Sequence, residues 1–192
     1  MEIAIVLFDG AEELDWAGPW EVFAAWREGW PEDGIDVFTV ASTLEPIVCA
    51  KGLRVLADHT WDTAPGADVV VWPGGRGTRP MLGDEAIRGR VRALADRADV
   101  MASVCTGALV YADAGLLTGR RATTHWGSLD RLAELGAEVD PEARWVDHGD
   151  VITSAGVSAG IDMALHLVAR LHSRERAVEV RRYIQYDPEP PV

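Results

Sequence analysis

The chain has 192 residues, of which 48% are hydrophobic and 26% charged, and this is the mixture of an ordinary globular protein. Eighteen Lys and Arg residues against 31 Asp and Glu residues give a formal net charge of -13, which disfavours binding to nucleic acid or to an anionic membrane surface. With two cysteines, no basic N-terminal leader and no apolar run of membrane-spanning length, we expect one cytoplasmic domain over residues 1–192, without disulfides or a zinc site.

Short apolar runs alternate with segments of helical spacing along the chain. The continuous apolar run at 3–8 predicts a strand that is buried on both faces. Further strands are predicted at 35–40, 69–72, 100–104 and 151–153, with a short extended piece at 122–124. A first helix is expected to begin near Gly18, because Pro19 is favourable at a helix start. Further helices are predicted at 86–98, 106–114, 128–135, 158–171 and 173–183. The tail from Asp187 to Val192 has three prolines and is expected to lie extended on the surface.

Strands that alternate with helices predict right-handed crossovers and a mostly parallel sheet with helices on both faces. In such folds the functional site lies beyond the carboxyl ends of the strands, where the strand order reverses. Three features stand at these ends: Asp15 after the first strand, the Gly74-Gly75 turn after the third, and Cys105 after the fourth. We therefore expect the site to be built from them.

Cys105 lies between a buried strand and a helix, with Ser103 and Gly107 two positions to either side. This pattern is typical of a nucleophile elbow, a sharp turn that admits only small flanking side chains and projects the nucleophile at the edge of the sheet. The N-terminus of the following helix is expected to lower the pKa of the thiol through its partial positive charge and free N–H groups. The alternative is an inert buried cysteine, which is our interpretation of Cys49.

Asp15 has two interpretations. It can cap the helix that is expected to begin near Gly18. It can also be a carboxyl group beside Cys105 if the first and fourth strands are neighbours, and a nearby thiolate would then raise its pKa. Glu12 and Glu13 are rivals for this role, although acidic turns are usually only solvated.

The Gly74-Gly75 turn is either a simple turn or a source of backbone N–H groups that stabilise developing negative charge. Its sequence has neither the spacing of a dinucleotide-binding loop nor the Lys-Ser/Thr of a P-loop. None of the five histidines has metal-ligand spacing. His125 follows a short strand and can reach the same edge of the sheet, either as a binding residue or as a catalytic base.

Taken together, these motifs resemble the ThiJ/PfpI superfamily over nearly the whole chain, and within it the isonitrile hydratase-like members. The segments that carry the resemblance are Leu14-Asp15-Trp16-Ala17-Gly18-Pro19 with Glu21-Val22-Phe23, Pro73-Gly74-Gly75, Ser103-Val104-Cys105-Thr106-Gly107, Gly115-Leu116-Leu117 with Gly119-Arg120-Arg121-Ala122-Thr123-Thr124-His125-Trp126, Ala159-Gly160-Ile161-Asp162 and Tyr186-Asp187-Pro188-Glu189-Pro190-Pro191. The resemblance implies a flavodoxin-like α/β sandwich, a homodimer, and Cys105 as the nucleophile with Asp15 and Thr106 as its partners.

Departures from the superfamily's other patterns narrow the expected function. The protease-like members have histidine directly after the cysteine, where this chain has Thr106, so peptidase activity is not expected. The glyoxalase-like and deglycase-like members use a glutamate on the first-strand side, where this chain has Asp15. Regulators of the AraC kind append a helix-turn-helix region, for which an acidic chain that ends at Val192 is expected to have no room.

The resemblance thus implies hydration of an isonitrile to an N-substituted formamide through a covalent thioimidate on Cys105, without a metal or an organic cofactor. Gly74, Gly75 and His125 are expected to bind this small-molecule substrate. Two alternatives stay open. One is a glyoxalase-like or deglycase-like enzyme, and the other is a binding or redox-sensing module whose cysteine reacts with oxidants without turnover.

Overall fold

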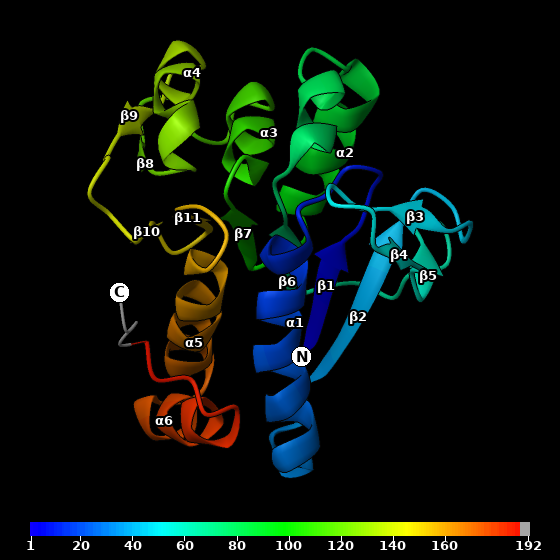
Figure 1. The fold of residues 1–192 in the computed structure, drawn as a ribbon, viewed down its shortest axis with the longest axis vertical. Helices are drawn as coiled ribbons and strands as arrows, with labels where there is room; N and C mark the ends of the chain where they lie inside the picture. Colours follow the sequence, from blue (N-terminus) through cyan, green and yellow to red (C-terminus); the bar gives the residue numbers. More distant parts are fainter. Residues whose placement is uncertain (189–192) are drawn as a thin grey trace.

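The computed structural model describes residues 1–188, which form a central sheet with helices on both faces (Figure 1). The order of strands in the sheet is β10-β11-β7-β6-β1-β2-β5, and among these described strands only β10 runs antiparallel to its neighbour. The strands of this sheet are β1 (Glu2–Val6), β2 (Asp36–Ala41), β5 (His59–Thr60), β6 (Val69–Trp72), β7 (Val100–Val104), β10 (Trp145–Asp147) and β11 (Val151–Ser154). Two small pairs lie outside it, β3 (Ile47–Val48) with β4 (Arg54–Val55), and β8 (Arg121–Ala122) with β9 (Glu138–Val139).

The five longer parallel strands follow the order β2-β1-β6-β7-β11, which is the flavodoxin-like order. The predicted fold class, a mostly parallel flavodoxin-like sandwich, is therefore confirmed. The strand order reverses between β1 and β6, so the crevice expected for a site opens at their carboxyl ends. The assumption that the first and fourth predicted strands are neighbours is wrong, because β6 lies between β1 and β7.

Helices bury both faces of the sheet. One face packs against α1 (Glu13–Gly29), α5 (Ala159–Leu171) and α6 (Arg174–Tyr183), and the other against α2 (Glu85–Ala95), α3 (Gly107–Asp113) and α4 (Leu129–Glu134). Short 3₁₀ helices are η1 (Pro31–Asp33), η2 (Arg76–Met81) and η3 (Trp126–Ser128). Successive β1 side chains alternate between the two cores, with Ile3 and Ile5 in the first and Ala4 and Val6 in the second. This double burial explains why the strand sequence is continuously apolar.

The first helix begins at Glu13, five residues before the predicted start near Gly18, so Pro19 lies inside the helix. Small residues let α1 pack closely against α5, and the two helices lie side by side in Figure 1. A Cβ atom added at Gly18 would lie 2.9 Å from Cγ1 of Ile161 in α5. This close packing fixes the N-terminal turn of α1, which carries Asp15, next to the segment that leads into α5.

The short strands β3, β4, β5, β9 and β10 were not predicted from the sequence, because runs of two or three residues carry no usable periodicity. The other predicted strands and helices are present, with ends shifted by a few residues. The predicted extended tail lies largely at residues 189–192, outside the described residues.

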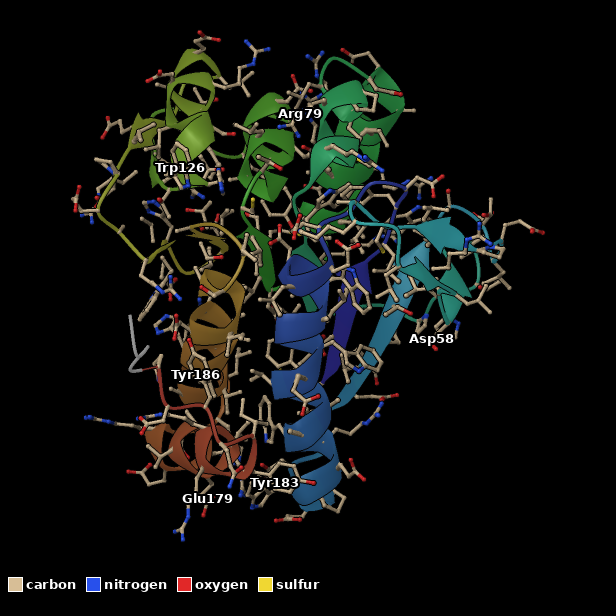
Figure 2. The ribbon with its side chains drawn as sticks, viewed as in Figure 1. Asp58, Arg79, Trp126, Glu179, Tyr183 and Tyr186 are labelled. Carbon is tan, nitrogen blue, oxygen red and sulfur yellow. The ribbon has the colours of Figure 1, made fainter. Side chains whose placement is uncertain are left out.

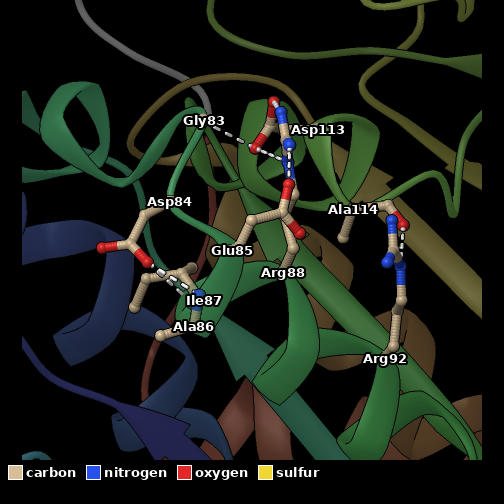
Figure 3. Close-up of polar contacts among 9 residues, drawn as sticks. All are labelled: Gly83, Asp84, Glu85, Ala86, Ile87, Arg88, Arg92, Asp113 and Ala114. Atoms are coloured by element: carbon tan, nitrogen blue, oxygen red, sulfur yellow. Dashed lines mark hydrogen bonds and ion pairs between the residues drawn. The ribbon is translucent and has the colours of Figure 1, made fainter.

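Polar contacts hold α2 against α3 (Figure 3). The Arg88 guanidinium donates two hydrogen bonds to the Asp113 carboxylate, of 2.9 and 2.8 Å, and Arg92 Nε donates to the Ala114 carbonyl at 2.9 Å. Asp84 caps α2 by accepting from the N–H of Ala86 at 2.8 Å. These contacts support α3, the helix that directly follows Cys105.

Candidate active site

Cys105 forms the turn between β7 and α3 with φ of +56°, in the left-handed region that residues with a β-carbon rarely adopt. Both of its backbone polar groups are bonded, because its N–H donates to the Ala155 carbonyl at 3.1 Å and its carbonyl accepts from Thr124 Oγ1 at 2.7 Å. A Cβ atom added at Gly107 would come within 2.2 Å of the Trp72 carbonyl oxygen, so only glycine fits there. The predicted nucleophile-elbow turn is present, with the small neighbour that it requires.

Asp15 lies in the first turn of α1 and is completely buried. Its Oδ2 accepts a 2.9 Å hydrogen bond from the N–H of Gly74, so it does not cap the helix, and the capping interpretation is wrong. Its Oδ1 has no partner of ordinary hydrogen-bond geometry within residues 1–188. The Cys105 thiol and the N–H of Val157 also face this carboxyl group. The α1–α5 packing, and not direct pairing of their strands, brings Asp15 to Cys105.

The carboxyl and the thiol have pKa values that burial moves in the same direction. Burial raises the pKa of Asp15 to about 6, although the N–H of Gly74 lowers it. The predicted rise is confirmed, but burial and not a thiolate is its main cause. Burial first, and the Asp15 charge second, raise the pKa of the Cys105 thiol, and they outweigh the N–H groups of Thr106 and Val157. The expected lowering of the thiol pKa by the helix N-terminus is therefore wrong. At neutral pH the pair is a thiol beside a carboxylate.

Val157 is a contributor that the sequence did not indicate. Its φ is +51°, an unusual conformation for a β-branched residue, and its N–H faces both the Cys105 thiol and the Asp15 carboxyl. It precedes α5, so the segment that follows β11 supplies a donor to the site. Nothing in the sequence signals a valine in this conformation, because a turn of this kind normally selects glycine.

The Gly74-Gly75 turn holds the site together through its amides. Gly74 donates to Asp15, and the N–H of Gly75 donates to Thr106 Oγ1 at 2.9 Å. Both N–H groups are therefore occupied, and the expectation that they stabilise developing negative charge is wrong. A Cβ atom at Gly74 would lie 2.5 Å from the Thr106 nitrogen, so no other residue fits. The Thr106 hydroxyl also accepts from the Thr78 hydroxyl at 3.1 Å, and thus supports the turn and not the thiol.

A cleft of about 340 Å³ opens over Cys105. Its walls are Glu12, Ala50, Gly75, Arg76, Arg79, Cys105, Thr106, His125, Gly127, Ser128 and Val157. Two larger hollows, of about 430 and 390 Å³, lie along α6 and contain neither Cys105 nor Asp15. The cleft over Cys105 is therefore our candidate active site, and Asp15 lies beneath its floor.

His125 lines this cleft, as expected for a binding residue. Its Nδ1 accepts a 3.1 Å hydrogen bond from the N–H of Gly127, so the neutral ring carries its proton on Nε2. No hydrogen bond among residues 1–188 joins His125 to Cys105 or Asp15. This arrangement favours binding over the role of catalytic base.

Glu12 is more than a solvated acidic residue, because it lines the cleft and forms an ion pair with Lys51, the chain's single lysine. Cys49 is fully buried among apolar side chains and is not part of the cleft. Burial raises the pKa of its thiol as well. The interpretation of Cys49 as an inert cysteine thus fits its surroundings.

Within the part of the chain that the structure describes, no group of three or more His, Cys, Asp or Glu residues is placed to hold a metal ion. No described helix combines the length and the apolar character needed to cross a bilayer. Arg76 and Arg79, which the sequence analysis did not single out, line the cleft directly after the glycine turn. The sequence did offer a signal for them, since both residues follow a turn already placed at the site.

The chain is similar to known proteins over most of its length. The chain is 37% identical to the isonitrile hydratase of Pseudomonas putida over 191 residues, covering 100% of this chain and 81% of that protein. It is 27% identical to the glutathione-independent glyoxalase DJR-1.2 of Caenorhabditis elegans, over 74% of this chain and 77% of that one. The crystal structure of a ThiJ/PfpI family protein from Pseudomonas syringae superposes with a TM-score of 0.89 at 35% identity, over 100% of this chain and 77% of the other. Residues 1–170 match the DJ-1/PfpI family, and the chain belongs to that family.

Proposed function

We propose that the protein hydrates an isonitrile, R–N≡C, to the N-substituted formamide R–NH–CHO. One observation carries the proposal: a fully buried carboxyl, Asp15, lies against the elbow cysteine with no cationic partner in the described part of the chain and with a pKa raised to about 6. Such a group can accept and return a proton near neutral pH. The similarity to an isonitrile hydratase over the whole chain supports the same chemistry.

The first half of the reaction adds the thiol across the terminal carbon of the isonitrile. Asp15 takes the proton from the Cys105 thiol, the sulfur bonds to the carbon, and Asp15 delivers the proton to that same carbon. The product is a thioimidate, R–N=CH–S–Cys105, and no atom is lost. The raised thiol pKa suits this route, because the thiolate forms only as it attacks and Asp15 receives its proton.

The second half consumes one water molecule. Asp15, again a carboxylate, takes a proton from the water as the oxygen adds to the thioimidate carbon, and it passes that proton to the nitrogen to give R–NH–CH(OH)–S–Cys105. Collapse of this adduct breaks the carbon–sulfur bond, and Asp15 moves the hydroxyl proton to the sulfur, which releases R–NH–CHO. Cys105 and Asp15 thereby regain their starting states, and Thr106, Gly74 and Gly75 hold the carboxyl in place throughout.

The two alternatives fit the site less well. A redox-sensing cysteine needs an exposed thiolate, whereas the Cys105 side chain is buried and its thiol pKa is raised. A glyoxalase-like activity is the stronger rival because a relative carries that name. Methylglyoxal is therefore the competing substrate in any assay.

The test is turnover of a small panel of isonitriles by the purified protein, with the formamide followed by chromatography and methylglyoxal assayed in parallel. We expect formamide from wild type, and a loss of about 10⁴-fold or more in Cys105→Ala. Cys49→Ala is the matched control and should keep the activity, because Cys49 lies outside the cleft. Turnover of methylglyoxal and of no isonitrile would replace this proposal with the glyoxalase alternative.

We also propose that the protein is a cytoplasmic homodimer, as the family resemblance implies. Sedimentation velocity at micromolar concentration tests the assembly. A mass near 20.8 kDa, the monomer value, would contradict the dimer.

A further inference from the structure

We propose that the substrate carries a carboxylate on its R group, which Arg76 and Arg79 bind at the cleft wall. This inference rests on the proposed hydration for the identity of the reacting group, but the anion-binding site itself is argued from the charges of the cleft. Both arginines line the same cleft of about 340 Å³ as Cys105. The reacting carbon must meet the sulfur, so the charge belongs to the other end of the substrate.

The charge balance of the cleft is opposite to that of the whole chain. The protein has a formal net charge of -13, yet two arginines and one acidic residue line its cleft, with the Asp15 carboxylate beneath the floor. The acidic residue of the lining, Glu12, is already paired with Lys51. Within residues 1–188, neither Arg76 nor Arg79 forms an ion pair with a carboxylate. The cleft is thus a local positive site on an acidic protein.

Arg76 and Arg79 belong to the short helix η2, which directly follows the glycine turn. Arg79 Nη1 donates to the Gly75 carbonyl at 3.1 Å, which orients the guanidinium and leaves its other N–H groups for a ligand. Figure 2 labels Arg79, which belongs to η2, and Trp126, which begins η3. Residues of both 3₁₀ helices line the cleft. Arg76 follows Gly75 directly, and Gly75 is held by the Thr106 hydroxyl.

The opposite wall also offers donors. His125 Nδ1 accepts from the N–H of Gly127, so Nε2 is the ring nitrogen that carries a proton. Ser128 adds a hydroxyl group to the same wall. A planar guanidinium matches a carboxylate with two parallel hydrogen bonds, and a narrow cleft concentrates the field of its charges. The cleft volume is at the low end for ligand sites, which favours a short R group.

A pair of alkylating agents tests the anion site without any turnover of an isonitrile. Iodoacetate and iodoacetamide differ in one charged group and attack the same thiolate, so the ratio of their rates at Cys105 cancels the thiol pKa. We expect this ratio, normalised to that of glutathione, to exceed 1 in wild type and to fall about tenfold in the Arg76→Gln/Arg79→Gln double variant. Peptide mapping assigns the label to Cys105.

The matched control is Arg54→Gln/Arg97→Gln, which removes the same charge from two exposed arginines outside the cleft. It should leave the ratio unchanged. A normalised ratio below 1 in wild type, or an equal fall in both double variants, would show only the repulsion expected from a net charge of -13 and would overturn the site.

Turnover then tests the substrate class, with 3-isocyanopropanoate against its neutral methyl ester. We expect kcat/KM to favour the carboxylate by about tenfold or more, and the Arg76→Gln/Arg79→Gln variant to lose this preference. Hydration of both probes without a preference would overturn the inference and leave the proposed function intact. If neither probe is hydrated while the iodoacetate preference is present, the proposed function fails and the anion site stands.

Discussion

Asp15 and Asp113 are both shielded from water, but their neighbours differ. Asp113, at the end of α3, accepts two hydrogen bonds from the Arg88 guanidinium, and this contact holds its pKa below the usual range. Asp15 accepts a hydrogen bond from the Gly74 amide and has no cationic partner among residues 1–188, so burial raises its pKa to about 6. One carboxylate is fixed in its charged form, and the other is close to gaining a proton.

This difference separates a structural carboxylate from one suited to move protons. A paired carboxylate such as Asp113 gives up its charge only in acid and joins α2 to α3. An unpaired and buried carboxyl gains and loses a proton with little change in free energy near neutral pH. Cys105 lies beside Asp15, whereas the groups that act on Asp113 are Arg88, Arg131 and the Gly83 N–H. Asp15 is therefore the carboxyl that is placed to exchange protons with a nucleophile.

Neutralising each carboxylate in turn tests most directly whether Asp15 and Asp113 have different roles. Asp15→Asn should lower kcat for isonitrile hydration by about 10²–10⁴-fold, because the amide cannot carry the proton between sulfur and carbon. Asp113→Asn also removes one negative charge and should stay within about twofold in kcat while it lowers Tm, since Arg88 loses its partner. Steady-state kinetics of both variants measures kcat, and thermal unfolding measures Tm. Equal activity in Asp15→Asn and wild type would reduce Asp15 to a packing residue.

The second expected effect is on the free energy of unfolding, which changes with pH in opposite directions through Asp15 and Asp113. Asp15 has a pKa of about 6 when folded and 3.8 when exposed, so the folded state binds its proton more tightly and stability rises as the pH falls. Between pH 7.5 and 4.5 this contributes about 2 kcal/mol to the free energy of unfolding. Asp113, with a lowered pKa, contributes stability that is lost on acidification.

Urea unfolding of wild type and Asp15→Asn at both pH values measures the Asp15 contribution, because other groups cancel in the difference. Wild type should gain about 2 kcal/mol in its free energy of unfolding relative to Asp15→Asn when the pH is lowered from 7.5 to 4.5. A difference that does not vary with pH would contradict the raised pKa.

Much of the fold follows from the sequence, because its main signals are local. The strand β6 is a continuous apolar run, β7 is apolar except at Ser103, and both match the predicted ranges. The start of α1 differs from the prediction, because Pro19 is favourable at a helix start but lies in the helix interior. There it packs near Gly160 of α5. A rule based on local preference cannot anticipate packing between helices that are far apart in the chain.

The candidate site was predictable in its residues but not in its interactions. Cys105 was found from the small residues around it, which the turn requires. The use of the Gly74 and Gly75 amides, and the left-handed backbone of Val157, depend on how three loops meet and leave no mark in the sequence. The rise in thiol pKa depends on burial of the whole pair, whereas the sequence displayed only the helix N-terminus.

The pH dependence of activity gives a further test of the difference between Asp15 and Asp113. Below pH 6 the Asp15 carboxyl is protonated and cannot accept the thiol proton, so kcat/KM should fall about tenfold for each pH unit. Asp113→Asn should show the same acid limb, because that carboxylate does not take part. Initial rates with a neutral isonitrile, corrected for uncatalysed hydrolysis in acid, give the profile. An acid limb that persists in Asp15→Asn would assign it to another group.

The smallest effect concerns the support of Asp15. The Thr106 hydroxyl accepts from the Gly75 N–H at 2.9 Å, and the neighbouring Gly74 N–H is the donor that lowers the pKa of Asp15. Thr106→Val keeps the side-chain shape but leaves the Gly75 N–H without its acceptor, which costs about 1–3 kcal/mol of stability. As the turn loosens, the Gly74 bond weakens, and the acid limb should move to higher pH while kcat/KM falls about tenfold.

Thr106→Ser is the matched control for this change, because it keeps the hydroxyl and should retain both the wild-type limb and an activity within about threefold. A lower rate in Thr106→Val with the limb unmoved would mean that the hydroxyl positions the cleft wall alone. Since Asp113 has no contact with this turn, a shifted limb would show that the proton affinity of Asp15 is set by the loop that follows β6 and not by the general acidity of the protein.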